Sequence, residues 1–142
     1  ISEIRSFKNE LNVSPGSFID LSMSKIDKKN KDFLKKNEIV LKKLGRISNF
    51  LPQDINKPSA SLVIKGKVFK IYFDENIDLN LIKENLLNKQ SKYQAEMDKI
   101  QSKLKNKDFV KRAPKHIVEQ EKTNYNNLKN DIKKISLTVK SL

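Results

Sequence analysis

The sequence predicts an α+β protein: a small helix-on-sheet unit followed by a long antiparallel two-helix coiled-coil hairpin. Two observations predict this fold class. Residues 79–105 and 115–141 each repeat apolar side chains at helical spacing over 27 positions. The nine residues between them form a basic segment that closes with Pro114. So short a link forces two helices, each about 40 Å long, to fold back on each other. We therefore expect an arm that carries charge at a distance from its parent body.

The first twelve residues have the pattern of a helix end. Asn12 suits the left-handed conformation that often terminates a helix, and Pro15 and Gly16 then turn the chain. Because the chain opens inside this pattern and without methionine, we expect it to be a piece of a longer protein, with residues 1–12 ending a preceding helical domain. Four apolar residues recur at helical intervals: Ile1, Ile4, Phe7 and Leu11.

Residues 13–77 show the patterns of a small α/β unit. Residues 27–44 have helical spacing, with Asp27 or Asn30 as the cap and Gly45 ending the helix. A β-hairpin is expected to turn about Gly66. The predicted strands are residues 18–23, 46–50, 59–65 and 67–73. The side chains expected to face inward from the helix are Phe33, Leu34, Val40, Leu41 and Leu44.

Residues 78–142 contain two apolar seams. The first has a stutter, two consecutive four-residue steps that end at Gln90, whereas the second is an unbroken 3-4 heptad repeat. Asp78 is expected to cap the first helix, and Pro114 suits the first turn of the second. The first seam comprises Leu79, Ile82, Leu86, Gln90, Tyr93, Met97, Ile100 and Leu104. The second comprises Val118, Glu121, Tyr125, Leu128, Ile132, Ile135, Val139 and Leu142.

The chain is strongly basic, with 30 Lys and Arg against 17 Asp and Glu and a net charge of +13. Such a surface attracts polyanions, most often nucleic acid. However, only three of these cations are arginine, and an excess of Lys, Asn and Ile is also what an adenine- and thymine-rich genome encodes at any surface. Only clustering of the charge therefore counts as evidence for a binding site.

The charge does cluster at the predicted hairpin tip. Residues 99–115 carry seven basic side chains against Asp108 alone, a net charge of +6. We expect these cations to contact a phosphate backbone without reading sequence, while the planar Arg112 could also stack on a base. The alternative is a tip that is merely solvated. Phe109 and Val110 are expected to plug the end of the hairpin. The tip cluster consists of Lys99, Lys103, Lys105, Lys107, Lys111, Arg112 and Lys115.

Each long helix also carries a lateral row of lysines, most of which we expect to serve solubility rather than binding. The two rows fall on opposite sides of an antiparallel pair and cannot form one face. The first row is Lys89, Lys92, Lys99 and Lys103, and the second is Lys115, Lys122, Lys129, Lys133 and Lys140.

Nothing in the sequence predicts catalysis, a metal site or a cofactor site in this segment. His116 is the only histidine, cysteine is absent, and the three glycines do not form a phosphate-binding loop. The lack of cysteine fits a reducing compartment. No apolar run approaches 18 residues and no signal-peptide pattern is present, so no membrane association is expected.

Several segments resemble the C-terminal end of bacterial-type valyl-tRNA synthetases. Leu104–Pro114, followed by Val118, Glu119, Glu121 and Lys122, is similar to that family's helix–turn–helix arm. Residues 12–16, Asn-Val-Ser-Pro-Gly, together with Ile4 and Arg5, resemble the family's exit from the anticodon-binding helical domain. Gly66–Phe73, followed by Ile77, Asp78 and Leu79, resembles its strand leading into the arm. The resemblance covers nearly all of the chain, although residues 20–58 match only in layout.

The resemblance implies part of an ATP-dependent aminoacyl-tRNA synthetase that joins valine to its cognate tRNA. In such an enzyme, residues 1–12 would end the anticodon-binding domain and residues 78–142 would be the tRNA-binding arm. Residues 13–77 would form a small α/β unit that links the two. That arm contacts the outer corner of the tRNA, where the D and T loops meet. ATP would be used by the full-length enzyme and no cofactor by this segment. A cytoplasmic monomer with valine tRNA as its partner is expected.

One departure from the family affects the expected mechanism. Family arms favour Arg, Glu and Ala, whereas this one favours Lys and Asn. Fewer arginines favour plain electrostatics over base stacking. By position, the family's contact with tRNA would fall to Lys103, Lys105, Lys107, Lys111, Arg112 and Lys115.

Two other functions remain open from the sequence. The hairpin could be a protein–protein adaptor whose seam is completed by a partner helix, an idea supported by an exposed Leu87 and the polar Gln90. It could also be the arm of another nucleic-acid-binding ATPase, although the Asn-Val-Ser-Pro-Gly segment argues against this.

Overall fold

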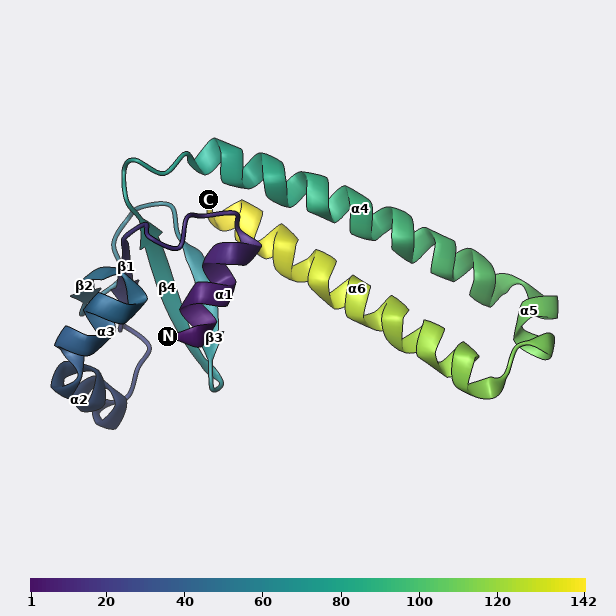
Figure 1. Ribbon diagram of the computed structural model, residues 1–142, viewed down its shortest axis with the longest axis horizontal. Helices are drawn as coiled ribbons and strands as arrows, with labels where there is room; N and C mark the ends of the chain where they lie inside the picture. The colour runs from purple at the N-terminus through teal and green to yellow at the C-terminus, as the bar shows by residue number, and fades with distance from the viewer. The chain divides into compact units, whose positions relative to one another are not determined.

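The computed structural model describes all 142 residues, which form two compact units. The first comprises residues 1–83 with residues 141–142, and the second comprises residues 84–140. A mixed sheet with helices and a long helical hairpin confirm the predicted fold class (Figure 1). The elements are α1 (Ser2–Glu10), β1 (Ile19–Ser22), α2 (Lys28–Lys36), α3 (Glu38–Gly45), β2 (Ile47–Leu51), β3 (Ala60–Ile64), β4 (Lys67–Phe73), α4 (Leu79–Lys105), α5 (Lys107–Arg112) and α6 (Lys115–Ser141).

The four strands form one sheet in the order β2-β1-β4-β3. β1 runs parallel to β2 and antiparallel to β4, and β4 runs antiparallel to β3. The connection between the parallel strands carries α2 and α3, as a parallel pair requires a crossover. Ile19 and Leu21 from β1 and Ile71 from β4 are almost completely buried at the centre of this core.

The hairpin between β3 and β4 turns at Lys65 and Gly66, as predicted. Both residues have positive φ, 49° and 75° respectively. Two consecutive residues with positive φ match the twist of the flanking strands, and glycine adopts this conformation without steric cost.

The N-terminal helix packs within the sheet unit. Ile4, Phe7 and Leu11 are buried, and Asn12 has a φ of 54°, which confirms the predicted helical spacing and left-handed end. The assignment of residues 1–12 to a preceding domain stays a prediction.

Lys8 on this helix is unusual because its side chain is only 1% exposed. Its Nζ donates to the carbonyl oxygens of Ser17 at 2.7 Å and Gly45 at 3.2 Å. Burial, and to a lesser extent the positive charge of Arg46, lowers the pKa of Lys8. The lysine thus holds α1 against both the following loop and the end of α3.

The prediction of one continuous helix over residues 27–44 was wrong, because the structure has two helices there, α2 and α3. The structure breaks it at Asn37, whose φ is −108° and whose Nδ2 donates to the Phe33 carbonyl at 2.8 Å. The break resets the helical phase, so one apolar stripe cannot face the sheet across both α2 and α3. Phe33, Val40 and Leu44 are exposed rather than inward, whereas Leu34 and Leu41 are half-buried.

The ends of these two helices also differ in detail from the prediction. Asp27 is the N-cap residue of α2, but its carboxylate accepts from the Asn30 side chain and makes no capping bond to the backbone. α3 does end at Gly45, yet the left-handed residue is Arg46, with a φ of 52°. A Cβ at Gly45 would lie 3.1 Å from Cδ1 of Ile47, so any other residue there requires the Ile47 side chain to shift slightly.

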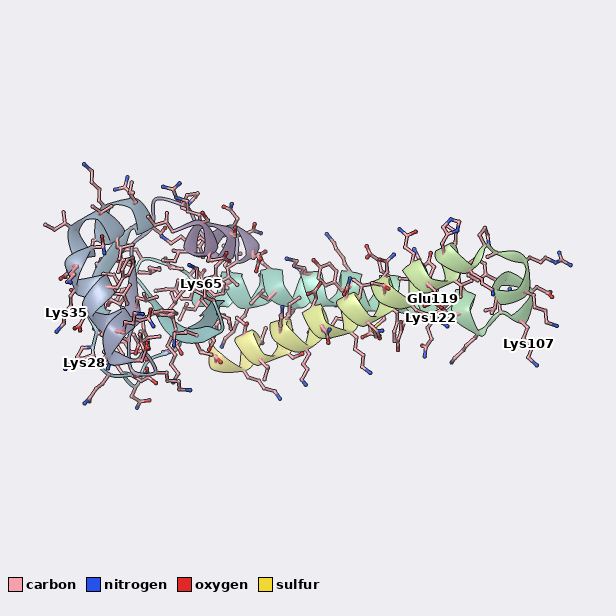
Figure 2. The ribbon with its side chains drawn as sticks, turned by 90° about the horizontal axis from the view of Figure 1, so that it is seen from below. Lys28, Lys35, Lys65, Lys107, Glu119 and Lys122 are labelled. Carbon is pink, nitrogen blue, oxygen red and sulfur yellow. The ribbon has the colours of Figure 1, made fainter.

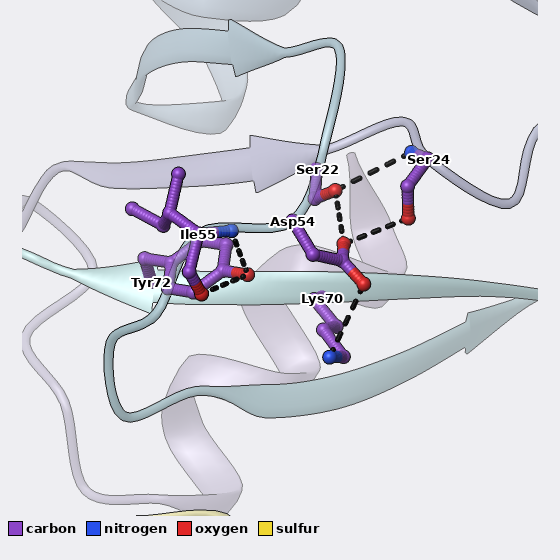
Figure 3. A network of polar contacts seen from close by, with 6 residues as sticks. All are labelled: Ser22, Ser24, Asp54, Ile55, Lys70 and Tyr72. Atoms are coloured by element: carbon purple, nitrogen blue, oxygen red, sulfur yellow. Dashed lines mark hydrogen bonds and ion pairs between the residues drawn. The ribbon is translucent and has the colours of Figure 1, made fainter.

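A polar network attaches the loop after β2 to the sheet (Figure 3). One carboxylate oxygen of Asp54 accepts from the hydroxyls of Ser22 at 2.6 Å and Ser24 at 2.7 Å. Its other oxygen lies 3.2 Å from Nζ of Lys70. The two serine hydrogen bonds, with the nearby lysine, lower the pKa of Asp54 to about 2. The network comprises Ser22, Ser24, Asp54, Ile55, Lys70 and Tyr72.

α4 and α6 have the bounds that the sequence predicted and lie side by side as an antiparallel pair (Figure 1). All sixteen predicted seam positions are buried or half-buried, which confirms both seams. Asp78 caps α4, since its Oδ1 accepts from the backbone N–H groups of Asn80 at 3.0 Å and Leu81 at 3.1 Å. Pro114 lies immediately before the first residue of α6 rather than inside its first turn.

The polar seam residues find partners across the hairpin. Nε2 of Gln90 donates to Oγ of Ser136 at 2.7 Å, and Nζ of Lys103 lies 3.6 Å from Oε1 of Glu121. Moving forward along α4 from Gln90 to Lys103 corresponds to moving back along α6, as an antiparallel register requires. Side-chain pairs inside the hairpin therefore satisfy the polar interruptions of its seam.

Candidate nucleic-acid interface

The link at the hairpin tip contains a short helix, α5, that the sequence analysis did not predict. Asn106 caps it: its Oδ1 accepts from the backbone N–H of Asp108 at 3.0 Å and of Phe109 at 3.4 Å. An Asn at the cap with an acidic residue in the first turn is a recognisable start signal. Residues 106–114 were instead expected to form a turn that closes with Pro114. The tip is thus a folded element with defined side-chain directions.

The seven cations of the tip cluster come from three consecutive helices. All seven are exposed. Figure 2 shows one of them, Lys107, at the closed end of the hairpin. Lys99, Lys103 and Lys105 lie on the last turns of α4; Lys107, Lys111 and Arg112 lie on α5; and Lys115 begins α6.

Almost none of this charge is neutralised by the protein. Lys103 is the only member of the cluster with a carboxylate within 4.0 Å, that of Glu121. Asp108 is the only acidic residue in the segment and forms no ion pair. Six cations therefore face solvent without a partner, and they create a concentrated positive potential at one end of the hairpin.

Helix stability explains some of these cations but not all. Lys103, Lys105, Lys111 and Arg112 lie in last turns, where a cation favours the helix dipole. Lys107 and Lys115 instead occupy first turns, where the same dipole disfavours a cation by roughly 0.3–1 kcal/mol. The dipole of its own helix therefore gives no reason for a cation at either position.

The predicted apolar plug is only half correct. Phe109 is half-buried, whereas Val110 is 42% exposed. The reason is α5 itself, because successive residues of a helix point about 100° apart and cannot both face its end.

Some lysines of the lateral rows interact with their own helix. Nζ of Lys89 lies 5.6 Å from the ring centroid of Tyr93 on α4. Lys122 lies 3.5 Å from Glu119 on α6, and both side chains are labelled in Figure 2. These lysines are partly occupied by local contacts, unlike the unpaired cations of the tip.

The structure contains no group of three or more His, Cys, Asp or Glu residues that could hold a metal ion. None of its helices combines the length and the apolar character that a membrane crossing requires.

Comparison with known proteins places this hairpin in a family. Residues 78–142 match the family model described as the valyl tRNA synthetase tRNA binding arm. The whole chain is 61% identical over 142 residues to the valine–tRNA ligase of Pelagibacter ubique. The chain matches a C-terminal fragment of valyl-tRNA synthetases. The resemblance seen in the sequence is thereby confirmed, and the region that matches the tRNA binding arm contains α4, α5 and α6.

Other valine–tRNA ligases are also similar over most of the chain. The valine–tRNA ligase of Bartonella quintana is 31% identical over 143 residues, which cover 100% of this chain and 16% of that enzyme. The valine–tRNA ligase of Francisella tularensis is 30% identical over 124 residues, covering 86% of this chain and 14% of that enzyme. The Pelagibacter match likewise covers 100% of this chain and 16% of its relative. The chain thus spans about a sixth of the length of these relatives.

Proposed function

We propose that this chain is the noncatalytic tRNA-binding part of a valine–tRNA ligase, and that its tip cluster binds phosphates at the outer corner of valine tRNA. The observation that carries the proposal is the set of six unpaired cations at one end of a hairpin that matches a tRNA-binding-arm family. Residues 1–12 would end the anticodon-binding domain and residues 78–142 would be the arm. Residues 13–77 would form the unit that links them.

The proposed mechanism is electrostatic. Each lysine that contacts a phosphate releases condensed counterions, so binding is strong at low salt and independent of base sequence. The contact would hold the tRNA while other parts of the enzyme perform ATP-dependent valylation. ATP would bind outside this chain, and the whole enzyme would act in the cytoplasm as a monomer.

The test measures affinity of the chain for valine tRNA as a function of salt concentration. One variant reverses three tip cations, Lys107→Glu, Lys111→Glu and Arg112→Glu. If each contacts one phosphate, the slope of log affinity against log salt becomes shallower by roughly two to three.

A matched control reverses three exposed cations of α6 outside the tip cluster, Lys129→Glu, Lys133→Glu and Lys140→Glu. The control changes net charge by the same amount, so we expect it to retain most of the slope. Equal losses in the two variants would show that the length of the arm, not its tip, binds the tRNA. A flat salt response of the unaltered chain would refute the electrostatic mechanism.

A protein–protein adaptor is the second candidate because Leu87 on α4 is exposed, as expected for an incomplete seam. Gln90 no longer supports it, since Ser136 on α6 already satisfies its amide. Analytical ultracentrifugation separates the two functions: an adaptor self-associates or needs a protein partner, whereas a tRNA-binding arm sediments as a monomer that shifts on adding tRNA.

A further inference from the structure

We infer that α2 in the sheet unit is a second RNA-contact surface, on which lysines bind phosphates and the exposed Phe33 stacks on an unpaired base. The inference deepens the proposed function and rests on it, because it takes RNA to be the polyanion that the chain binds. It concerns residues outside the hairpin that matches the tRNA-binding-arm family.

α2 is the most basic helix of the sheet unit. Five of its nine residues are lysine and one is aspartate, so the helix carries a charge of +4. None of the five lysines has a carboxylate within 4.0 Å, and the neighbouring Asp27 pairs instead with Lys67 of β4. Figure 2 shows Lys28 and Lys35 projecting from this part of the molecule. As at the hairpin tip, the charge is concentrated and uncompensated.

An aromatic side chain lies among these cations. Phe33 is 60% exposed, although the next residue, Leu34, is half-buried on the side of α2 that faces the unit. Lys29 precedes Phe33 by four residues and Lys36 follows it by three, so both share its face of the helix. A flat ring flanked by cations is the arrangement with which proteins stack an unpaired base while they neutralise its phosphates.

The adjacent helix shows that this is not a general property of the surface. On α3, Lys42 pairs with Glu38 at 2.7 Å, and the exposed apolar residues Ile39 and Val40 are aliphatic. Aliphatic side chains do not offer the planar face that a base needs. Unpaired lysines beside an exposed ring are therefore found on α2 and not on the adjacent α3.

A protein segment is the competing occupant. Phe33 and Leu34 help to line a cavity of about 320 Å³, together with Leu41, Phe50 and Phe69. An apolar side chain from a partner could fill this cavity and cover Phe33. However, protein interfaces are depleted in lysine, whereas α2 is mostly lysine on its outer side. The charge favours RNA.

The experiment uses the 142-residue chain with its tip cluster intact and two fluorescein-labelled probes, a 12-nucleotide oligoadenylate and a 12-base-pair RNA duplex. Phe33→Ala is expected to weaken oligoadenylate binding at least about fivefold, which is the lower range for losing one stacked base. Phe33→Trp keeps an aromatic ring and is expected to bind oligoadenylate like the unaltered chain. Duplex binding should stay within twofold, since its bases are already stacked.

The phosphate contacts are tested by Lys29→Glu with Lys36→Glu. We expect the salt slope for oligoadenylate to become shallower by roughly 1.4, the value for two single-strand phosphate contacts. The control is Lys43→Glu with Lys57→Glu, two exposed lysines of the same unit that form no ion pair. This control changes the net charge by the same amount as the α2 variant. Its salt slope should stay within about half a unit of that of the unaltered chain.

The outcomes separate this inference from the proposed function. If α2 variants bind both probes and valine tRNA like the unaltered chain while the tip variants lose affinity, the inference is overturned and the arm proposal stands. This is also the outcome if a protein segment occupies Phe33. If the α2 variants lose affinity and the tip variants do not, the second surface stands and the tip proposal fails. An unaltered chain with no RNA affinity at low salt overturns both.

Discussion

The cap at Asn106 controls whether three cations of the tip cluster have fixed positions. α5 has only six residues, too few to be stable as an isolated helix. Its first turn is held by the Asn106 side chain, which accepts from two backbone N–H groups. We predict that Asn106→Ala unfolds α5 locally while α4 and α6 stay folded.

The magnitude follows from the capping interaction. Replacing an Asn cap by Ala costs about 1 kcal/mol, which raises the population of the open form roughly fivefold. Lys107, Lys111 and Arg112 then lose their fixed positions, but their charges remain. The affinity for valine tRNA should therefore fall by about two- to fivefold, with the salt slope changed by less than one. Reversing the charges of these residues should instead change the salt slope strongly.

Amide hydrogen exchange is the direct assay. The N–H of Val110 donates to the Asn106 carbonyl at 3.1 Å, and the N–H of Ala113 donates to the Phe109 carbonyl at 2.9 Å. Both amides should exchange about fivefold faster in Asn106→Ala, since exchange reports local opening. Asn106→Ser keeps an oxygen acceptor and should behave like the unaltered chain. Unchanged exchange at both amides in Asn106→Ala would refute the role of the cap, as would equal effects of Ala and Ser.

Two further predictions concern single carboxylates. Glu121→Gln removes the only carboxylate paired with the tip cluster, that of the Lys103 contact at 3.6 Å. We expect the slope of log tRNA affinity against log salt to steepen by up to about one, because Lys103 becomes available to phosphate. The free energy of unfolding should change by less than about 1 kcal/mol. A weaker tRNA affinity would contradict this prediction. Asp54 has a folded pKa of about 2 against an ordinary value of 3.8, so its stabilising contribution is complete above pH 4 and is lost as the pH falls towards 2. Its carboxylate is partly exposed, so the contribution should be no more than about 1 kcal/mol. Urea unfolding at pH 6 and pH 2 should show a smaller pH dependence for Asp54→Asn, and an equal dependence would count against the serine network.

Much of the arm could be predicted from the sequence because its determinants are local. The seams that begin at Leu79 and Val118 follow from the spacing of apolar residues, and the cap at Asp78 is a side chain beside its own helix. The tip cluster was likewise visible as a run of charge. What spacing could not show was α5, because a six-residue helix has too few turns for a periodic pattern. The consequence was a wrong prediction for Val110, which is exposed.

The lengths of α4 and α6, the β-hairpin at Gly66 and the clustering of cations at residues 99–115 could all be predicted from local sequence, since each depends on neighbours within a few positions. Which side chains are buried in the sheet unit depends instead on packing between distant segments. Lys8 is buried where the carbonyl oxygens of Ser17 and Gly45 accept its hydrogen bonds, and Phe33 is exposed although its neighbour Leu34 is half-buried. Burial depends on partners that are far away in the chain. Periodicity within one segment therefore cannot predict it.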